Sequence, residues 1–553
     1  MNPALNSESF LLTRWRPYII FFLLGCLFYL PGITRLPPTD RDEARFAQAS
    51  RQMLETGNFV DIRFQDRPRY KKPIGIYWLQ AASVKIFSNP DDSKIWPYRL
   101  PSFLGALLSV LVTFYLGKRF FTPRAGFLAG LLLESSVLLH VEATLATTDG
   151  FLLFTITAMM AMLGVVYVSI DRPPGMASWG FWLFCGLGVL LKGPVPLLVA
   201  FLTVAALCLF DRNLDLVRRL RPARGGLLLL LVVLPWFWAI HKATGGQFLR
   251  KAFMEDLLPK LLGGHESHGA PPGLYVALIP VLFWPGILIL PGALKEGWRS
   301  RTNRAVRFLF AWAIPTWLAF ELIPTKLPHY ILPVFPAISI LAGFYLDGVV
   351  SIRKEKKNFI DTLSKWIFIA VTLGICLGGL ALALYFTHRL SVAVLVVLAA
   401  GGILVWLAIS SRKRPWQHTI ATVCLVSGSL IVMPVFTFIL PSADGIWLSR
   451  EVFKALRPKA GTTRPVLASV GYHEPSLVFL LGTQTRIDSL QEAVNDMTNK
   501  RITHLLVPEK ERGALLREAR NRGVRLRLIK RIRGFNYSKG KWMNLSLYQV
   551  RLK

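Results

Sequence analysis

Long apolar stretches recur through most of the chain and limit the folds open to it more than any other feature. Many run for roughly eighteen residues or more with few charges, which is long enough to cross a bilayer as a helix. Because backbone polar groups in lipid must be satisfied within the segment, such stretches predict helices. Hydrophobic residues make up 53% of the 553 positions, so the chain is predicted to be a polytopic helical membrane protein.

The apolar stretches predict about thirteen membrane helices, with boundaries located only to within several residues. The predicted spans are 17–33, 97–117, 125–141, 149–169, 177–191, 194–210, 225–242, 273–293, 305–323, 328–349, 364–386, 390–410 and 417–440. The first span has no small-residue cleavage site, so it is expected to remain as a helix. All five cysteines fall inside apolar segments, which argues against a disulfide framework or a zinc cluster.

Five short loops rich in arginine and lysine predict the orientation of the chain. They lie near 118–124, 212–224, 299–307, 353–357 and 412–414. All five fall on the cytoplasmic side if the odd-numbered helices run outward, as positively charged loops generally do. The N-terminus is therefore expected in the cytoplasm, and the first loop and the C-terminus outside. Much of the net charge of +33 lies in these loops, so it does not indicate a nucleic-acid partner.

The loop at 37–79, directly after the first span, carries a dense pattern of charges. Asp42 and Glu43 precede Arg45, and a second basic cluster follows at Arg67, Arg69, Lys71 and Lys72. Apolar residues at helical spacing in 46–54 and 74–81 predict two short helices lying on the outer membrane surface. A structural alternative stays open, in which a capping box from Thr39 to Asp42 begins a helix and the cations anchor lipid headgroups.

The composition changes near residue 442. Segments typical of strands and of helices alternate from there to residue 553, which predicts a small α/β domain on the outer face. The chain is therefore divided into a membrane domain, 1–441, with an outer loop at about 34–96, and an α/β domain, 442–553. The second domain is rich in arginine and lysine, and its basic face is either simply solvated or a dock for anionic lipid headgroups.

Ionisable residues near membrane depth are costly and are therefore candidates for a site. Glu142 and Asp149 lie between the third and fourth predicted spans, and Lys192 lies in the tight turn after the fifth. Lys326, His329 and Tyr330 follow the ninth span. All are expected at the outer ends of the helices, together with Arg45, Lys71 and Lys72. The structural alternatives are a snorkelling Lys192 and an Asp149 that caps a helix.

A metal is a further alternative. His265, Glu266 and His268 lie in the sequence GGHESHGAPPG, a loop rich in glycine and proline. Their spacing matches no familiar set of metal ligands, so they remain candidates for part of a divalent-metal site without a firm precedent. No cofactor is otherwise indicated.

Several fixed cations in apolar surroundings suit a lipid phosphate held at the membrane interface. Glycosyl transfer from a polyprenyl phosphate needs such an anion clamp, together with contacts to a sugar that develops positive charge. If the acceptor is a hydroxyl, Asp42 is the candidate general base. If the acceptor is a phosphate, it is already anionic and needs no base. The carboxylate would then orient the sugar or balance the cations.

Five motifs in the right order resemble the ArnT-like membrane glycosyltransferases of the GT-C, protein-mannosyltransferase-like superfamily. They are DEARFAQASRQMLETGNFV, RYKKPIGIYWL, TTDG, LLKGPVP and KLPHYILP. The resemblance implies a fold of about thirteen membrane helices with outward juxtamembrane helices and a periplasmic C-terminal α/β domain. It also implies the bacterial inner membrane, an undecaprenyl-phosphate-linked sugar donor and, in the best-known members, transfer of aminoarabinose to a lipid A phosphate.

The resemblance also assigns roles to individual residues. It implies Asp42 with Glu43 as the catalytic acidic motif, and a donor phosphate bound by Arg45, Lys72, Lys192, Lys326 and Tyr330. Asp149, Glu142 and Lys71 are further candidates. Many relatives carry an acidic residue where this chain has Lys71. This departure puts a bound metal and a positively charged amino sugar in doubt, and leaves a neutral or acidic sugar as an alternative.

The leading hypothesis is an integral membrane glycosyltransferase, inverting by resemblance alone, that moves a lipid-linked sugar to lipid A. A second hypothesis keeps the chemistry and changes the acceptor to a protein or another glycan. A third is a polyprenyl-lipid flippase or transporter with no chemistry. The sequence has no evident inverted repeat or paired broken helices of the transporter kind, which favours the enzyme.

Overall fold

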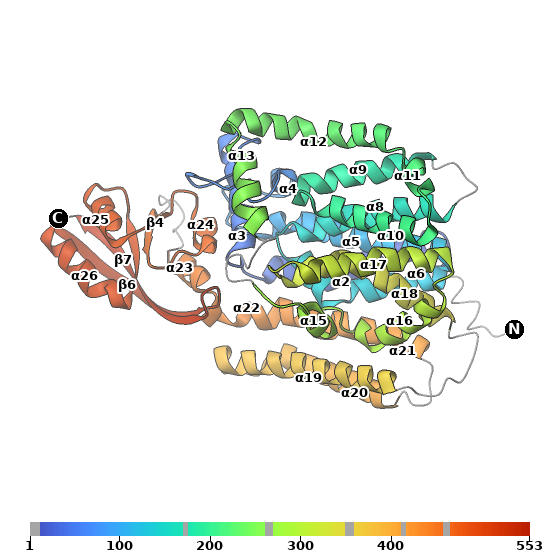
Figure 1. Cartoon of the computed structure of the whole chain (residues 1–553). Helices are drawn as coiled ribbons and strands as arrows, with labels where there is room; N and C mark the ends of the chain where they lie inside the picture. Colours follow the sequence, from blue (N-terminus) through green and yellow to red (C-terminus); the bar gives the residue numbers. More distant parts are fainter. Residues whose placement is uncertain are drawn as a thin grey trace.

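A helix bundle with a small α/β domain at one end makes up the computed structural model of this protein (Figure 1). The structure describes residues 12–169, 175–259, 269–348, 359–410, 416–456 and 465–552. The predicted fold class is confirmed, because the bundle is built from long apolar helices and the C-terminal part contains a five-stranded sheet.

Ten helical stretches within the described residues are long and apolar enough to cross a membrane, so the chain is a multi-pass membrane protein. They are α2 (Arg16–Arg35), α5 (Trp96–Phe120), α8 (Asp149–Val168), α9 (Gly175–Lys192), α12 (Pro222–Thr244), α17 (Arg304–Leu322), η3 (Pro328–Val334) with α18 (Phe335–Gly348), α19 (Phe359–Thr387), α20 (Val392–Ser410), and the stretch Thr419–Ser442. The last stretch runs through α21 (Trp416–Val426), η5 (Ser427–Val432), η6 (Val435–Ile439) and α22 (Leu440–Ser442).

Three of the predicted spans are not among these ten stretches of the described residues. The third is a pair of helices, α6 (Pro123–Glu134) and α7 (Val137–Thr144), bent by 62° at the break between them. The sixth, α10 (Val195–Asp211), is apolar but only 17 residues long. The number of crossings therefore stays a prediction.

The predicted span 273–293 is the third exception, because it is broken into short pieces. The pieces are α15 (Leu274–Leu282), η2 (Gly286–Leu288) and α16 (Leu290–Arg299). Pro280, Pro285 and Pro291 recur through this segment, and each proline lacks the N–H that a continuous helix requires. Hydropathy alone does not register such breaks.

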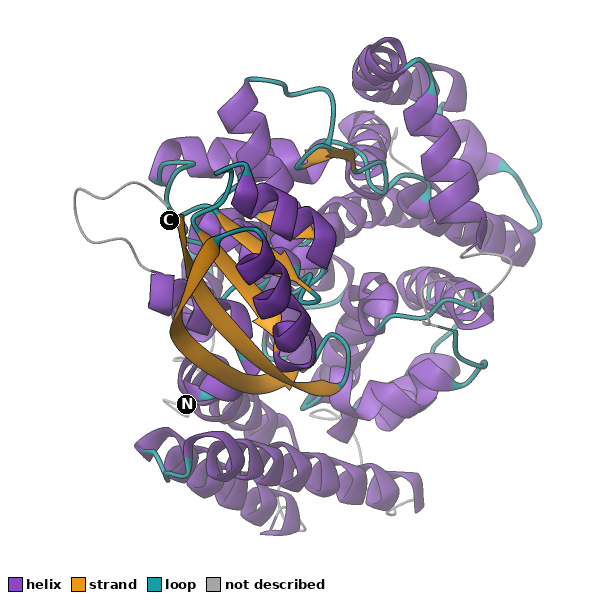
Figure 2. Cartoon of the chain, turned by 90° about the vertical axis from the view of Figure 1, so that its left-hand side faces the viewer, coloured by secondary structure: helices purple, strands orange, loops and turns teal. Residues whose placement is uncertain are grey.

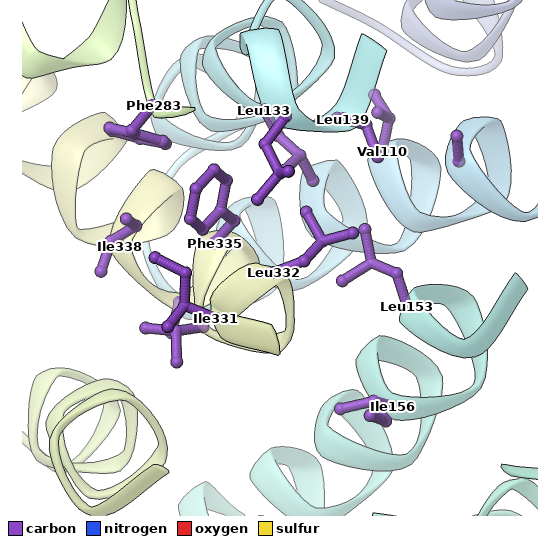
Figure 3. Packing of buried hydrophobic residues seen from close by; sticks show 14 of the residues in the cluster. Val110, Leu133, Leu139, Leu153, Ile156, Phe283, Ile331, Leu332, Phe335 and Ile338 are labelled. Atoms are coloured by element: carbon purple, nitrogen blue, oxygen red, sulfur yellow. The ribbon is translucent and has the colours of Figure 1, made fainter. Parts of the chain in front are cut away.

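The bundle has one continuous apolar core, part of which is shown in Figure 3. Leu133 of α6 and Leu153 of α8 meet Leu332 and Phe335 at the junction of η3 and α18. Helices approach closely at glycines, since a side chain at Gly105 would collide with the backbone of α8. Small residues permit this close packing, which stabilises helix pairs in lipid.

The first loop forms the two short helices that its periodicity predicts. They are α3 (Asp42–Thr56) and α4 (Gly75–Phe87), joined through a small hairpin of β1 (Arg63–Phe64) and β2 (Arg67–Pro68). Phe46, Ala49 and Met53 on the predicted stripe of α3 are buried. Helix α3 ends at Gly57, whose left-handed backbone conformation suits glycine. In Figure 1, α13 (Gln247–Arg250) lies at the same end of the bundle, followed by the π-helical η1 (Lys251–Leu257).

The α/β domain follows the predicted order of elements. Its elements are α23 (Leu448–Leu456), β3 (Leu467–Val470), α24 (Pro475–Leu481), β4 (Arg486–Asp488), α25 (Leu490–Thr498), β5 (His504–Pro508), α26 (Glu509–Asn521), β6 (Val524–Asn536) and β7 (Lys541–Leu552), after the short η7 (Asp444–Ile446). The sheet order is β4-β3-β5-β7-β6, parallel among β4, β3 and β5 and antiparallel elsewhere. Figure 2 shows this sheet in front of the bundle.

Two of the basic loops that predict orientation, at 212–224 and 299–307, lie at the other end of the bundle. Helix α11 (Asp215–Leu220), which carries two of these arginines, lies away from the α/β domain in Figure 1. Arg307, at the start of α17, pairs with Asp211, at the end of α10, with 2.5 Å between nitrogen and oxygen. The cations of at least these two loops therefore lie on one side of the molecule, as predicted.

Candidate active site

A cavity of about 290 Å³ opens at the end of the bundle that carries α4, α13 and η1. Its polar lining comes from five parts of the chain that are far apart in sequence. These residues are Lys71, Lys72, Asp149, Lys192, Asp256 and His329. The structure thus brings together six predicted candidates in the wall of one cavity: Lys71, Lys72, Asp149, Lys192, His329 and Tyr330.

Two lysines of the cavity pair with buried carboxylates. The Nζ atom of Lys192 donates to Oδ1 of Asp149 at 2.5 Å and lies 4.9 Å from the centre of the Tyr330 ring. The Nζ atom of Lys72 lies 3.4 Å from Oδ2 of Asp256 on η1. Lys192 is therefore part of a buried ion pair rather than a snorkelling side chain. Paired charges of this kind are already held in place for an incoming anion.

His329 lies between two carboxylates at the inner side of this polar group. Its Nδ1 atom is 3.7 Å from Glu142, and its Nε2 atom is 3.7 Å from Asp149. Glu142 also accepts a hydrogen bond of 2.8 Å from the hydroxyl of Thr147. Asp149 is the first residue of α8 but makes no side-chain cap there. Its side chain is committed to Lys192, His329 and the Thr148 hydroxyl instead.

The rest of the cavity wall is apolar. Aromatic and aliphatic side chains from α12, α13, η1 and α17 line it, including Phe237, Phe248, Leu249, Phe253, Leu257 and Phe320. An apolar wall that ends in cations is suited to an amphipathic anion, with its hydrocarbon part against the aromatic rings and its charged group at the lysines.

Asp42 lies outside this cavity, on the surface of the neighbouring loop. It is the first residue of α3, and 61% of its side chain is exposed. Its Oδ1 atom is 3.7 Å from the guanidinium of Arg69, a buried side chain stacked 4.9 Å from the Phe46 ring. Arg69 is only two residues before Lys71, so one short stretch of chain joins the partner of Asp42 to the cavity.

The capping box predicted from Thr39 to Asp42 is absent from this described loop. Thr39 donates through its backbone N–H and its hydroxyl to Glu43, at 2.8 Å each, and α3 has no side-chain cap. Asp42 still lies in the first helical turn, where a carboxylate is favourable. Its side chain is thus available for chemistry as well as for helix stabilisation.

Glu43 differs from Asp42 both in burial and in its bonding partners. It is buried and accepts from the guanidinium of Arg99 at 2.7 and 2.9 Å and from the backbone N–H of Ala146 at 2.8 Å. Burial alone raises the pKa of this carboxyl, but Arg99 and the hydrogen bonds outweigh it and hold the pKa below its usual value. Ionised Glu43 therefore ties the loop to α5 and to the turn before α8.

Other predicted residues do not line the cavity. Arg45 lies on α3, and the lining residues of the cavity do not include it. Lys326 is buried and donates to the carbonyls of Ala270 and Ile323 at 2.9 and 2.8 Å. His265, Glu266 and His268 lie outside the described residues. Within the part of the chain that the structure describes, no three or more His, Cys, Asp or Glu side chains are arranged to hold a metal.

Two site residues were missed from the sequence. Asp256 lies outside every predicted span, although apolar residues from Phe248 to Leu257 recur at helical spacing around it. A carboxylate in such a stripe is a usable signal, but its partner Lys72 is 184 positions away. Arg69 was recognised only as one of several loop cations, because nothing in the sequence indicates that it alone is buried.

The site combines lysine–carboxylate pairs with an apolar cavity in a bundle of membrane helices, an arrangement suited to a lipid-linked anion. A family model for dolichyl-phosphate-mannose-protein mannosyltransferase matches residues 71–238. The chain is also 28% identical over 403 residues to undecaprenyl phosphate-alpha-4-amino-4-deoxy-L-arabinose arabinosyl transferase 2 of Pseudomonas fluorescens (strain Pf0-1), with 72% of this chain and 71% of that protein covered.

A second relative and a solved structure agree with this match. The arabinosyl transferase of Aeromonas salmonicida (strain A449) is 29% identical over 428 residues, which covers 75% of each protein. In fold, the chain is similar to ArnT from Cupriavidus metallidurans bound to undecaprenyl phosphate, with a TM-score of 0.74 and 19% identity over 96% of this chain and 97% of that one. The chain is thus similar to ArnT-like glycosyltransferases both in sequence and in fold.

Proposed function

We propose that this protein transfers a sugar from an undecaprenyl-phosphate donor to lipid A at the periplasmic face of the bacterial inner membrane. The names of its relatives, which are arabinosyl transferases acting with undecaprenyl phosphate, support the reaction class and the donor. The N-terminus would be cytoplasmic, residues 1–441 would form the catalytic membrane domain, and residues 442–553 would form a periplasmic domain.

The observation that carries this proposal is the cavity with lysines at one end and aromatic side chains along its walls. A polyprenyl phosphate combines a long hydrocarbon tail with a single anionic group, and the cavity offers complementary surfaces to both. We assign the phosphate to Lys72 and Lys192, assisted by Lys71 and Tyr330. The phosphate would take over these lysines from Asp256 and Asp149, and the lysines would stabilise its charge as the glycosidic bond breaks.

Asp42 would act on the other side of the transfer. With a lipid A phosphate as acceptor, no base is required, and Asp42 would orient the incoming group together with Arg69. With a hydroxyl acceptor, Asp42 would remove its proton. Glu43 would position Asp42 through its pair with Arg99, since its own carboxylate is fully engaged. Arg45 would add positive charge near the acceptor, and Lys326 would hold the segment at Ala270 in place.

The names of the relatives and the residue at position 71 point to different sugars. An aminoarabinose-type sugar is the donor group in the names of the relatives. Lys71 stands where many relatives carry an acidic residue, and a lysine there is better matched to a neutral or acidic sugar. A divalent metal would need the segment that holds His265, Glu266 and His268, and the transfer step proposed here does not depend on one.

Mass spectrometry of glycolipids from a deletion strain tests the proposal. The strain is complemented with wild type, Asp42→Asn or Asp66→Asn, and equal protein levels in the membrane are verified. Asp66 lies at an exposed turn of the same loop, so its variant controls for loss of a carboxylate there. We expect a sugar-sized mass on lipid A with wild type and Asp66→Asn but not with Asp42→Asn.

Each other outcome has a definite meaning. If lipid A is unmodified in every strain, the lipid A acceptor is wrong, and glycoproteins and other glycans are searched for the same mass. If Asp42→Asn modifies lipid A fully, Asp42 only begins a helix. A defect in lipid movement without any missing glycosylated product would identify a transporter.

A further inference from the structure

The two residues before Asp42 are held by the α/β domain, although that domain lies more than 430 positions away in sequence. The backbone N–H of Asp40 donates to the hydroxyl of Tyr537 at 2.6 Å, and its carboxylate accepts from the hydroxyl of Ser476. The Arg41 side chain donates to the carbonyl of Ser538. Tyr537 and Ser538 lie in the turn between β6 and β7, so two separate elements grip this short segment.

The backbone at Arg41 shows why such a grip matters. Its φ of 67° and ψ of −108° form a combination that glycine adopts easily and that side-chain-bearing residues rarely adopt. A strained residue persists only where its surroundings determine it from several sides. Here the hydrogen bonds of Asp40 and Arg41 provide those constraints, and the strained residue directly precedes Asp42.

The gripping side chains are themselves fixed. The hydroxyl of Ser476 lies 2.6 Å from that of Ser449, which is 2.8 Å from the hydroxyl of Tyr472. Tyr537 packs against Trp447, with ring centres 6.0 Å apart. Rigid partners of this kind can impose a conformation on the loop rather than follow it.

The residue after Asp42 is held from the opposite side. Glu43 is bound to Arg99 of α5, a helix of the membrane bundle. Asp42 is therefore the exposed residue between one neighbour fixed by the α/β domain and another fixed by the bundle. Its carboxylate is located where the two parts of the molecule meet.

We infer that the α/β domain positions Asp42 for the transfer reaction, with Asp40, Ser476 and Tyr537 as the positioning residues and Arg41 as the strained link. This inference rests on the proposed role of Asp42 in glycosyl transfer. It assigns the domain a part in catalysis in addition to any role in binding lipid headgroups.

The domain has other contacts that keep it docked when this grip is removed. Further along α3, Gln48 donates to the hydroxyl of Thr483 at 2.7 Å, and that hydroxyl donates to Glu55 at 2.6 Å. Phe479 of α24 packs against Tyr98 of α5 at 5.3 Å between ring centres. Loss of Ser476 and Tyr537 hydroxyls should therefore loosen the loop without releasing the domain. Thr483→Val provides a matched control, because it removes polar contacts of the same interface away from Asp42.

The test compares four full-length proteins in lipid nanodiscs: wild type, the double variant Ser476→Ala/Tyr537→Phe, Thr483→Val, and the double variant with Arg41→Gly added. Transfer is measured with undecaprenyl-phosphate-linked aminoarabinose as donor and lipid A as acceptor, and undecaprenyl phosphate binding by native mass spectrometry. For the double variant we expect kcat to fall about tenfold, with the KM for the donor and lipid binding nearly unchanged. Thr483→Val should retain the wild-type kcat.

Arg41→Gly gives the sharpest expectation, since glycine adopts the required backbone conformation without help. It should restore most of the kcat lost in the double variant, although it also removes the bond to Ser538. A rescue by glycine is not expected if the hydroxyls only stabilise the domain interface. Thermal unfolding of the variants should remain close to wild type.

Three results would overturn the inference. They are an unchanged kcat in the double variant, an equal loss in Thr483→Val, or a loss that Arg41→Gly does not relieve. If wild type itself transfers no sugar in this assay, while its mass-spectrometric test on lipid A also fails, the proposed function is wrong rather than the positioning role.

Discussion

The cavity and the loop in front of it hold their charges in contrasting ways. In the cavity, Lys192 and Lys72 lie 2.5 and 3.4 Å from carboxylates that are almost fully buried. On the loop, Asp42 is 61% exposed and 3.7 Å from its cationic partner Arg69. The cavity is suited to a lipid whose phosphate replaces the carboxylates as the partner of the lysines. The loop presents a loosely paired carboxylate to a molecule arriving from solution or from the membrane surface.

The contrast explains how one reaction can use both regions. A donor with a hydrocarbon tail must be desolvated, and buried cations bind its phosphate most strongly in low-dielectric surroundings. An acceptor must be able to approach and leave, so the residue that meets it is better exposed. We therefore expect changes in the cavity to affect donor binding, and changes at Asp42 to affect transfer alone.

The largest expected effect comes from breaking the buried ion pair between Glu43 and Arg99. Glu43→Ala leaves the guanidinium of Arg99 buried without its carboxylate, which costs about 3–5 kcal/mol of folding stability. Thermal unfolding in detergent should shift strongly downward and transfer should be lost. Asp66→Ala serves as the control, since Asp66 is an exposed acidic residue of the same loop. An unchanged unfolding temperature for Glu43→Ala would show that the buried pair does not hold the loop.

Lys192→Met should impair the binding of the donor phosphate in the cavity. It removes a cation from the phosphate site and leaves Asp149 with only His329 and the Thr148 hydroxyl. We therefore expect transfer to fall by about 10²–10³-fold. The retention of undecaprenyl phosphate should fall with it. Lys192→Arg keeps the charge in a different shape and should recover part of both. If Lys192→Met transfers normally, the phosphate does not bind at this lysine.

Arg69→Met tests whether the cation beside Asp42 contributes to transfer. It removes the cation beside Asp42 but keeps an apolar stem against Phe46, so the loop should remain folded. We expect kcat to fall by about tenfold through loss of the cation paired with Asp42, while donor binding stays unchanged. Steady-state kinetics with varied donor and varied acceptor separate these effects. A rise in the donor KM alone would move Arg69 to the donor side of the site.

The smallest expected effect is a pH dependence of folding stability that arises from Asp40. Burial first, and then the nearby Glu474, raise the pKa of Asp40 to about 7. In the unfolded chain this carboxyl has its ordinary pKa near 4, so the folded protein binds the extra proton. Folding stability from this group is therefore full below pH 4 and is lost as pH rises toward and through 7.

Thermal unfolding between pH 5 and pH 8 measures this effect. Wild type should lose about 1 kcal/mol or less across the range because Asp40 is partly exposed and screened. Asp40→Asn cannot titrate and should show a flatter profile. Identical profiles for the two proteins would exclude Asp40 as the source of the dependence.

Much of the architecture could be predicted from the sequence because it depends on local patterns. The spacing of apolar residues predicts α3, α4 and the alternating elements of the α/β domain, and the structure confirms all of them. The broken segment at 273–293 was missed because hydropathy averages over its prolines. Its breaks could have been predicted by giving the prolines more weight.

The site was predictable in its composition and less so in its geometry. Asp42 and Glu43 look alike in sequence, but neighbouring helical residues project about 100° apart, so one is exposed and the other buried. Lys326 and Lys192 are both predicted to bind the donor phosphate. The side chain of Lys326 instead donates to the backbone carbonyls of Ala270 and Ile323. The partners of Asp256 and Tyr537 could not be predicted, because only the three-dimensional packing brings Lys72 and Asp40 to them.

The most direct test of this division of labour measures lipid binding and transfer on the same preparations. Undecaprenyl phosphate retained by wild type, Asp42→Asn and Lys192→Met is quantified by native mass spectrometry, and lipid A modification is measured in parallel. We predict that Asp42→Asn retains the lipid as wild type does but transfers no sugar, whereas Lys192→Met loses both. Loss of the lipid from Asp42→Asn, or normal transfer by Lys192→Met, would contradict the account.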